Sequence, residues 1–234
     1  MLQVIVLAGG LATRLRPISE KIPKSLIEIN GEPFIFHQMR LLKSKGFERV
    51  VVCAGYLGNM IEDMVGNGEK FDLDVVYSYD GEVLLGTGGA VRNAFPLLDE
   101  KFMITYGDSY LDFDYAVLNS FFEQNEYPAV MTIFKNEDHF DRSNVLYENG
   151  RILYSKKNKS ADMNYIDYGF SAVTKNIFNS FCIYDKFDLS IVFEKLSADG
   201  QLSAFEVTNR FYEIGSFQGI TELESYLKKK INIL

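Results

Sequence analysis

The chain has 234 residues, of which 47% are hydrophobic and 24% charged, which is the composition of a folded globular protein. Its net charge of −8 disfavours a general nucleic-acid binder or a protein of anionic membranes, because both need a basic face. The two cysteines, Cys53 and Cys182, lack metal-ligand spacing. No apolar run approaches the ~18 residues that a membrane span needs, and the first residues lack the basic start of a signal peptide. We therefore expect a cytoplasmic protein with reduced thiols and neither a nucleic-acid nor a membrane partner.

The first half of the chain alternates between apolar runs typical of buried strands and amphipathic segments typical of helices. In chain order, we predict strands at Val4–Ala8, Arg49–Ala54, Asp74–Ser78, Lys101–Tyr106 and Ala129–Phe134, and helices at Pro33–Lys45, Leu57–Val65, Gly88–Phe95 and Asp114–Glu123. This alternation predicts an α/β fold with a doubly wound, mostly parallel sheet. Ligands of such sheets bind beyond the carboxyl ends of the strands.

The second half changes character after about residue 135. Predicted strands at Asn144–Tyr147 and Ile152–Ser155 flank an Asn-Gly turn, which is a hairpin signal. Further strands are predicted at Ile166–Val173, Leu202–Thr208 and Arg210–Ile214, and Ser216 is predicted to cap a terminal helix. No linker or repeat separates the halves. We therefore expect one domain over residues 1–234, with a small antiparallel subregion in its second half.

The strongest chemical motif follows the first predicted strand. In the run Leu7-Ala8-Gly9-Gly10, the glycines let the backbone approach a ligand and turn its amides toward an anion. Arg14 can then place a delocalised charge on phosphate oxygens, and Lys24 can add a compact one. The spacing is neither that of a Rossmann fingerprint nor that of a P-loop, since no later glycine pair and no Gly-Lys-Ser/Thr closes it. The motif predicts a phosphate-binding loop.

This segment resembles the signature of the sugar-phosphate nucleotidylyltransferases, which reads L-A-G-G-x-G-T-R-L-x-P followed by a P-K pair. The matching residues are Leu7, Ala8, Gly9, Gly10, Thr13, Arg14, Leu15, Pro17, Pro23 and Lys24. Ala12 stands where the family usually has glycine. Three further segments match in the same order, so that the resemblance covers nearly the whole chain.

The resemblance assigns roles to these segments. Gly86 and Thr87 match a stretch that contacts the nucleobase in the family, and Asp108 matches a Gly-Asp motif whose carboxylate holds Mg²⁺ against the triphosphate. Glu213 matches a second metal carboxylate that is usually aspartate. Without the resemblance, the alternative interpretations are a plain helix-start turn for Gly86 and Thr87, a helix cap for Asp108 and a surface residue before a capped helix for Glu213.

The acceptor residues give weaker signals. Lys156, with Lys157 as the alternative, resembles the lysine that faces the sugar phosphate in the family. Asp167 and Gly169 fall where family members line the sugar pocket. His37 and His139, the only histidines, are interpreted as a structural and a loop residue, so that triad hydrolysis has no support.

Taken with the resemblance, residues 1–135 form a nucleotide-binding half and residues 136–234 a sugar-phosphate-binding half. The implied reaction is direct attack of a sugar 1-phosphate on the α-phosphorus of a nucleoside triphosphate, which gives a nucleotide sugar and pyrophosphate. The resemblance places this reaction in nucleotide-sugar and cell-surface polysaccharide biosynthesis. Arg14, Lys24 and Asp108 would be catalytic; Leu7, Ala8, Gly9, Gly10, Thr13, Gly86 and Thr87 would bind the nucleotide; and Mg²⁺ would be the cofactor.

The short form of the chain most resembles mannose-1-phosphate and heptose-1-phosphate guanylyltransferases, and GTP is favoured on that analogy alone. Two alternatives stay open. One is a cytidylyltransferase acting on a small phosphorylated alcohol, and the other is a nucleotide-binding regulatory module that has lost catalysis. The sugar is undetermined, and assembly as a homo-oligomer is left open.

Overall fold

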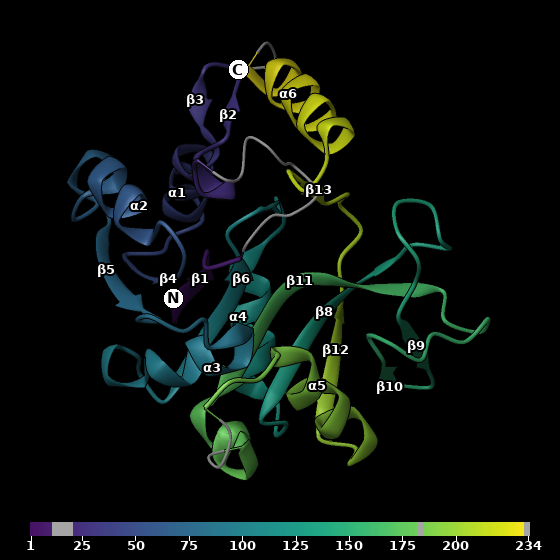
Figure 1. Ribbon diagram of the computed structural model, residues 1–234. Helices are drawn as coiled ribbons and strands as arrows, with labels where there is room; N and C mark the ends of the chain where they lie inside the picture. Colours follow the sequence, from purple (N-terminus) through teal and green to yellow (C-terminus); the bar gives the residue numbers. More distant parts are fainter. Residues whose placement is uncertain (11–20, 182–184, 232–234) are drawn as a thin grey trace.

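The computed structural model of the chain describes residues 1–10, 21–181 and 185–231 (Figure 1). Its strands are β1 (Gln3–Leu7), β2 (Glu28–Ile29), β3 (Glu32–Pro33), β4 (Arg49–Ala54), β5 (Asp74–Tyr79), β6 (Lys101–Tyr106), β7 (Ser109–Tyr110), β8 (Ala129–Lys135), β9 (Val145–Glu148), β10 (Arg151–Tyr154), β11 (Tyr165–Thr174), β12 (Leu202–Glu206) and β13 (Tyr212–Glu213). Its α-helices are α1 (Phe34–Ser44), α2 (Gly58–Val65), α3 (Gly86–Asn93), α4 (Tyr115–Gln124), α5 (Leu189–Ala198) and α6 (Phe217–Ile231). Within the described ranges, none of the helices is both long and apolar enough to cross a bilayer.

Four parallel strands form the first half of the central sheet. They lie side by side in the order β6-β1-β4-β5, and all the pairs within this order are parallel. Their carboxyl ends therefore meet at one edge of the sheet. This part confirms the predicted doubly wound arrangement.

The long strand β11 joins the second half to this sheet. It runs antiparallel to β6, pairing Phe170 with Thr105, and it also pairs with β8 and β9. Two further strands extend the same sheet, β10 as the hairpin partner of β9 and β12 parallel to β8, whereas β2 with β3 and β7 with β13 form separate two-stranded sheets. The sheet thus runs without a break from the parallel half into the predicted antiparallel subregion.

Helices cover both faces of the sheet. Alternate residues of β1 point to opposite sides: Val4 and Val6 belong to one hydrophobic cluster, Ile5 and Leu7 to the other. The first cluster includes residues of α1, α2 and α4, and the second includes residues of α3 and α5. A strand buried on both faces has to be apolar throughout, which explains the uninterrupted run in the sequence.

The C-terminal helix returns to the N-terminal half. Leu223 and Leu227 of α6 pack in a third cluster with Ile29 and Phe34, beside β2 and β3 (Figure 1). As predicted, Ser216 caps this helix, its Oγ accepting a hydrogen bond from Gly219 N at 3.1 Å. The returning chain passes through β13, which pairs with β7 directly after β6. The last segment of the chain is thereby brought to the edge where the parallel strands end.

Three predictions about elements need correction. Pro33 was expected inside the first helix, but it has φ −53° and ψ 136° and ends β3, so that α1 begins at Phe34. The third helix begins at Gly86 and not at Gly88. Helix α5 was not predicted, although Asp188 caps it and Leu189, Val192 and Phe193 are buried at helical spacing.

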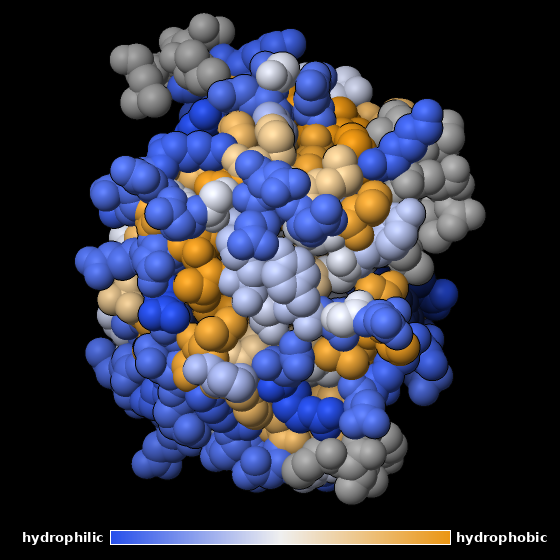
Figure 2. Space-filling model, turned by 60° about the vertical axis from the view of Figure 1, so that its left-hand side comes forward, coloured by the Kyte–Doolittle hydropathy of each residue, from blue (hydrophilic) through white to orange (hydrophobic). Residues whose placement is uncertain are grey.

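The surface is mostly hydrophilic on the face that Figure 2 shows, with hydrophobic residues in separate patches between charged and polar ones. The large hydrophobic side chains that are exposed on the molecule as a whole include Tyr56, Met64, Tyr79 and Val83. Hydrophobic patches divided in this way are ordinary for a globular surface.

Candidate active site

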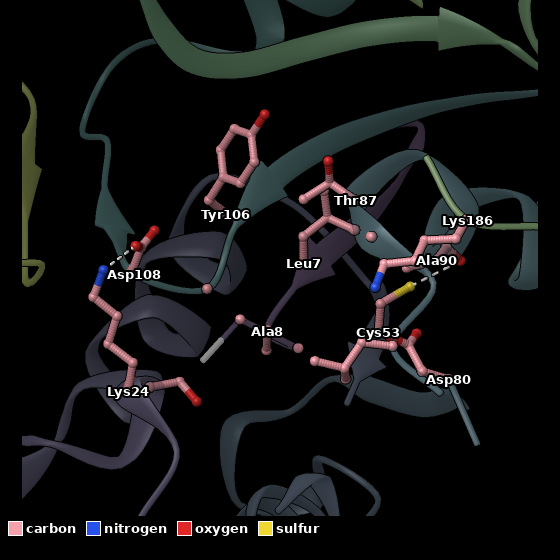
Figure 3. Close-up of a pocket in the computed structure, with 16 residues that line it drawn as sticks. Leu7, Ala8, Lys24, Cys53, Asp80, Thr87, Ala90, Tyr106, Asp108 and Lys186 are labelled. Atoms are coloured by element: carbon pink, nitrogen blue, oxygen red, sulfur yellow. Dashed lines mark hydrogen bonds and ion pairs between the residues drawn. The ribbon is translucent and has the colours of Figure 1, made fainter. Parts of the chain in front are cut away.

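A cavity of about 360 Å³ lies at the carboxyl edge of the four parallel strands (Figure 3). Its lining residues are Leu7, Ala8, Gly9, Gly10, Lys24, Ser25, Cys53, Asp80, Leu84, Gly86, Thr87, Ala90, Tyr106, Gly107, Asp108 and Lys186. Each parallel strand contributes a residue at or just beyond its end: Gly9 after β1, Cys53 in β4, Asp80 after β5 and Asp108 after β6. The cavity is therefore at the place where this fold binds ligands.

Close backbone contacts shape the floor of the cavity. Gly9 and Gly55 lie against each other, and a Cβ added to Gly55 would be 2.8 Å from the carbonyl oxygen of Gly9. Gly107 donates a hydrogen bond to the carbonyl oxygen of Leu7 at 2.9 Å, and a Cβ there would be 2.9 Å from that of Ala8. These approaches keep the strand ends together, and Gly9 and Gly10 line the cavity.

One end of the cavity carries opposite charges. Lys24, in a 3₁₀ turn after Pro23, forms an ion pair with Asp108, whose second oxygen accepts a hydrogen bond from Ser109 Oγ at 3.3 Å. The side chains of Lys24 and Asp108 keep 20% and 31% of their surface exposed, so both remain accessible from the cavity. Two residues far apart in the sequence, each predicted to be catalytic, thus meet at one point.

Glu213 reaches the same end through strand pairing. It lies opposite Ser109 in the β13–β7 pair, and Ile214 N donates to the carbonyl oxygen of Asp108 at 3.0 Å. Gly215 continues past Lys24, such that a Cβ on Gly215 would be 3.1 Å from the Lys24 Nζ. Glu213 is exposed, and the pairing places it opposite the residue that follows Asp108 in the chain. The described residues contain no cluster of three or more potential metal ligands.

The opposite end of the cavity combines a buried thiol with two further charged residues. Figure 3 shows Cys53, Asp80, Ala90 and Lys186 there, with Leu7 and Ala8 between them and the Lys24–Asp108 pair. The Cys53 thiol donates to the carbonyl oxygen of Ala90 at 3.4 Å, and burial raises its pKa far above the usual range. Cys53 is thus a neutral wall residue, in agreement with the predicted buried reduced thiol.

The glycine-rich start of α3 receives a segment of the second half. The Gly88 and Gly89 amides donate to the carbonyl oxygen of Phe187 at 3.0 and 3.3 Å, and Thr87 Oγ1 accepts from Leu189 N at 2.8 Å. A Cβ on Gly86, which has φ +73°, would be 2.6 Å from the Phe187 carbonyl oxygen. Gly86 and Thr87 line the cavity as predicted, but the neighbouring glycines serve to dock residues 185–187.

The predicted acceptor residues gather beyond Tyr106. Gly169, with φ +94°, lies where the β11–β8 pairing shifts register, and its amide donates to Asp167 Oδ1 at 3.0 Å. Burial raises the pKa of Asp167 to about 6, against the opposing effects of that hydrogen bond and of Lys156. A Cβ on Gly169 would be 3.7 Å from the Tyr106 ring, which links this group to the cavity wall.

Lys156 is fixed by two acidic residues of the second half. Its ammonium is 2.6 Å from Asp188 Oδ2, and its backbone amide donates to Glu194 Oε1 at 2.9 Å. Lys156, Asp167 and Gly169 lie outside the cavity lining. The structure ties Lys156 to the group near Asp167, whereas the choice between Lys156 and Lys157 stays a prediction.

Comparison with known proteins decides the family. A model of the family described as "Nucleotidyl transferase" matches residues 3–143. The chain belongs to this nucleotidyl transferase family. It is 29% identical to the D-glycero-alpha-D-manno-heptose 1-phosphate guanylyltransferase of Aneurinibacillus thermoaerophilus over 219 residues, covering 92% of this chain and 93% of that protein. It is also 29% identical to the enzyme of the same name from Campylobacter jejuni, over 80% of this chain and 82% of that protein.

Solved structures agree with this membership. HddC from Yersinia pseudotuberculosis, complexed with GMP-PN, is 26% identical, with a TM-score of 0.83 over 97% of this chain and 100% of that one. The inositol-1-phosphate CTP transferase from T. maritima is 26% identical, with a TM-score of 0.78 over 97% and 96%. The predicted family and the predicted fold are thereby confirmed.

The cavity brings together most of the predicted residues that the structure describes. Leu7 to Gly10, Lys24, Gly86, Thr87 and Asp108 line it, and Glu213 pairs with Ser109, next to Asp108 in the chain. Thr13, Arg14 and the family departure at Ala12 lie outside the described residues. Cys53, Asp80 and Lys186 were not predicted as site residues. Asp80 could have been found by its position after a strand, but no local signal marks Lys186.

Proposed function

We propose that this nucleotidyl transferase moves GMP from GTP to a sugar 1-phosphate and releases pyrophosphate. The observation that carries the proposal is the Lys24–Asp108 pair facing the Gly9–Gly10 turn across a cavity large enough for a nucleotide. The choice of GTP is supported by the two similar proteins named heptose 1-phosphate guanylyltransferases and by the similarity to HddC, a structure that holds GMP-PN.

The reaction is a direct displacement at the α-phosphorus. An oxygen of the acceptor phosphate forms the new P–O bond while the bond between the α-phosphorus and the bridging oxygen breaks, and that oxygen leaves with pyrophosphate. The attacking oxygen is already anionic, so no general base is needed. Catalysis then rests on holding the two phosphates in line and on stabilising charge that moves to the leaving group.

The residues at the glycine turn bind the triphosphate in this proposal. The Gly9 and Gly10 amides, together with Thr13 and Arg14, hold the phosphates that leave. Lys24 is directed at the phosphate that is transferred, since its ammonium lies between Asp108 and Gly215 at one end of the cavity. Leu7, Ala8, Gly86 and Thr87 contact the nucleoside along the cavity wall.

Asp108 and Glu213 fit a magnesium ion by the chemistry of their donors. Both are carboxylates that pairing of β7 with β13 brings to neighbouring positions, and Mg²⁺ in proteins takes one or two carboxylates and completes its shell with water and phosphate oxygens. The ion, when bound, would neutralise charge at the reacting phosphates. The shortage of further ligands among the described residues suits Mg²⁺ better than zinc, which usually takes three or four protein ligands.

The acceptor binds to the group beyond Tyr106. Lys156 counters the charge of the acceptor phosphate, Asp167 accepts hydrogen bonds from sugar hydroxyls, and Gly169 lets the ring approach the main chain. Lys156 is already paired with Asp188. The phosphate of the acceptor would therefore have to replace the Asp188 carboxylate as the partner of the Lys156 ammonium.

The test is a matrix of the four nucleoside triphosphates with Mg²⁺ against a panel of sugar 1-phosphates, with pyrophosphate release and product mass as readouts. We expect release with GTP and with mannose 1-phosphate or D-glycero-α-D-manno-heptose 1-phosphate in the panel. The similarity to the inositol-1-phosphate CTP transferase supports a second candidate, a cytidylyltransferase on a phosphorylated alcohol, so inositol 1-phosphate is included. Release with CTP and inositol 1-phosphate alone would replace the first candidate, and binding without release from any pair would leave a regulatory module.

A further inference from the structure

Two charged side chains stand at the end of the cavity away from Lys24 and Asp108. They are the Asp80 carboxylate, at the end of β5, and the Lys186 ammonium, from the segment before α5 (Figure 3). With the phosphates at the glycine turn, as in the proposed function on which this inference rests, the nucleobase occupies this other end. The base then meets one acceptor group and one donor group.

The Lys186 backbone is held on both sides. Before it, Asp185 lies 3.8 Å from an Arg92 nitrogen, and the Asp185 carbonyl oxygen packs against Gly89, where a Cβ would be 2.7 Å away. After it, Phe187 N donates to the carbonyl oxygen of Leu85 at 3.0 Å. No ion pair within the described ranges engages the Lys186 ammonium. The segment is thus fixed while its charged group stays available to a ligand.

The Asp80 carboxylate is held by a hydrogen bond from the main chain. Its Oδ2 accepts a hydrogen bond from Leu85 N at 3.1 Å, the one hydrogen bond that it receives from the part of the chain that the structure describes. Burial raises the pKa of this half-buried carboxyl, and the Leu85 hydrogen bond offsets this in part. N–H donors of a ligand would supply the hydrogen bonds that the carboxylate loses on burial.

We propose that Asp80 and Lys186 select guanine, with Asp80 accepting from the N1–H and the 2-amino group and Lys186 donating to O6. Guanine presents an acceptor beside two donors along its Watson–Crick edge, which is the complement of an ammonium beside a carboxylate. Adenine and cytosine would turn an amino group toward Lys186 and a ring acceptor toward Asp80. Uracil would satisfy one oxygen of Asp80 but set its O2 against the other.

The test pairs each side chain with the base atom that it contacts. Dissociation constants are measured by calorimetry with Mg²⁺ for GTP, for ITP, which lacks the 2-amino group, and for 6-thio-GTP, which keeps the N1–H and the 2-amino group but carries sulfur, a weaker acceptor, in place of O6. Binding to the wild type is expected to weaken roughly 10-fold for ITP and by a smaller factor for 6-thio-GTP. Asp80→Asn is expected to abolish most of the difference between GTP and ITP, and Lys186→Met most of that between GTP and 6-thio-GTP.

Matched controls separate base selection from general charge effects. Asp63→Asn and Lys229→Met change exposed residues and are expected to keep the wild-type constants. Lys186→Arg is expected to retain part of the preference for O6, because it keeps a donor. Equal losses of affinity for all three nucleotides in Lys186→Met would show that Lys186 binds phosphate, and would overturn the inference.

These binding constants do not depend on turnover. A wild-type protein that binds GTP selectively but releases no pyrophosphate with any acceptor would refute the proposed reaction and leave the base assignment standing. A protein that makes nucleotide sugars while binding GTP and ITP equally would refute the base assignment and leave the nucleotidyl transfer standing. Melting temperatures of all variants within a few degrees of the wild type serve as the check on folding.

Discussion

The two halves of the molecule prepare their sites by different means. In the parallel half, strand ends and glycines set the cavity: Gly55 and Gly107 admit main chain to within van der Waals contact of Gly9 and Ala8. In the second half, side chains hold one another, with Lys156 paired to Asp188 and Asp167 bonded to the Gly169 amide. In the proposed reaction, main-chain geometry would hold the triphosphate, whereas side-chain pairs that hold the acceptor can be exchanged without altering the sheet. In that proposal, the first half would carry the chemistry and the second half would choose the acceptor.

The largest expected effect comes from the chemistry of the first half. Asp108→Asn keeps the size of the side chain but removes the charge that faces Lys24 and that we assign to magnesium. Turnover should fall roughly 10²–10³-fold, the loss typical of one charge-stabilising group. Steady-state kinetics at saturating Mg²⁺ measure it, with Asp63→Asn as the matched control and the melting temperature as the check on folding. Turnover near the wild-type level would remove Asp108 from the metal site.

A smaller and more selective effect is expected from the lysine of the second half. Lys156→Met should raise the KM for the sugar 1-phosphate roughly 10-fold and leave the KM for the nucleotide unchanged, because only the acceptor loses a charged partner. Lys157→Met, made in parallel, should have little effect. A larger change in Lys157→Met would show that Lys157 is the acceptor lysine. A rise of both KM values in Lys156→Met would show that the second half does not bind the acceptor alone.

Asp167 predicts a pH dependence of stability that belongs to the second half. Its pKa is raised to about 6 from 3.8, so the native state binds the proton more tightly than the unfolded state does. Ionisation of Asp167 therefore costs stability as the pH rises from about 4 through 6, and the full cost, about 3 kcal/mol, is present at neutral pH. Asp167→Asn should accordingly stabilise the protein at pH 7.5 and not at pH 4, as measured by denaturant unfolding at both values. An equal difference at both pH values would contradict the assignment.

The smallest effect tests the junction between the halves. Thr87→Val keeps the shape but leaves Leu189 N without its acceptor, which should cost about 1 kcal/mol and lower the melting temperature by about 2–4 °C. Thr87→Ser keeps the acceptor and should restore most of the loss. Selectivity for GTP over 6-thio-GTP should weaken in Thr87→Val alone if the docked segment positions Lys186. Unchanged selectivity with the expected loss of stability would limit Thr87 to a structural role.

Much of this architecture could be predicted from local patterns. The strand at Arg49–Ala54 and that at Lys101–Tyr106 were predicted with their observed bounds, because β-branched and apolar runs buried on both faces leave a strong signal. The carboxyl-edge rule then located Gly9, Gly10 and Asp108 at one cavity. Pro33 misled the prediction, because a proline suits both the first turn of a helix and the extended residue that precedes it.

Other features depend on contacts that no local pattern carries. Lys186 follows no motif, and it lines the cavity only because Phe187 packs against Gly86 and Gly88 of a distant helix. The pairing of Lys24 with Asp108, and of β13 with β7, likewise joins segments far apart in the chain. Helix α5 is different, since its apolar spacing and its Asp188 cap are local signals in the sequence.

The central claim is tested most directly by competition among substrates in one reaction. The wild-type protein is incubated with Mg²⁺, equimolar ATP, CTP, GTP and UTP, and mannose 1-phosphate or D-glycero-α-D-manno-heptose 1-phosphate, and the nucleotide sugars formed are identified by mass spectrometry. We predict that the GDP-sugar is the dominant product and that it forms in step with pyrophosphate. Formation of another nucleotide sugar in excess, or of none, would contradict the account.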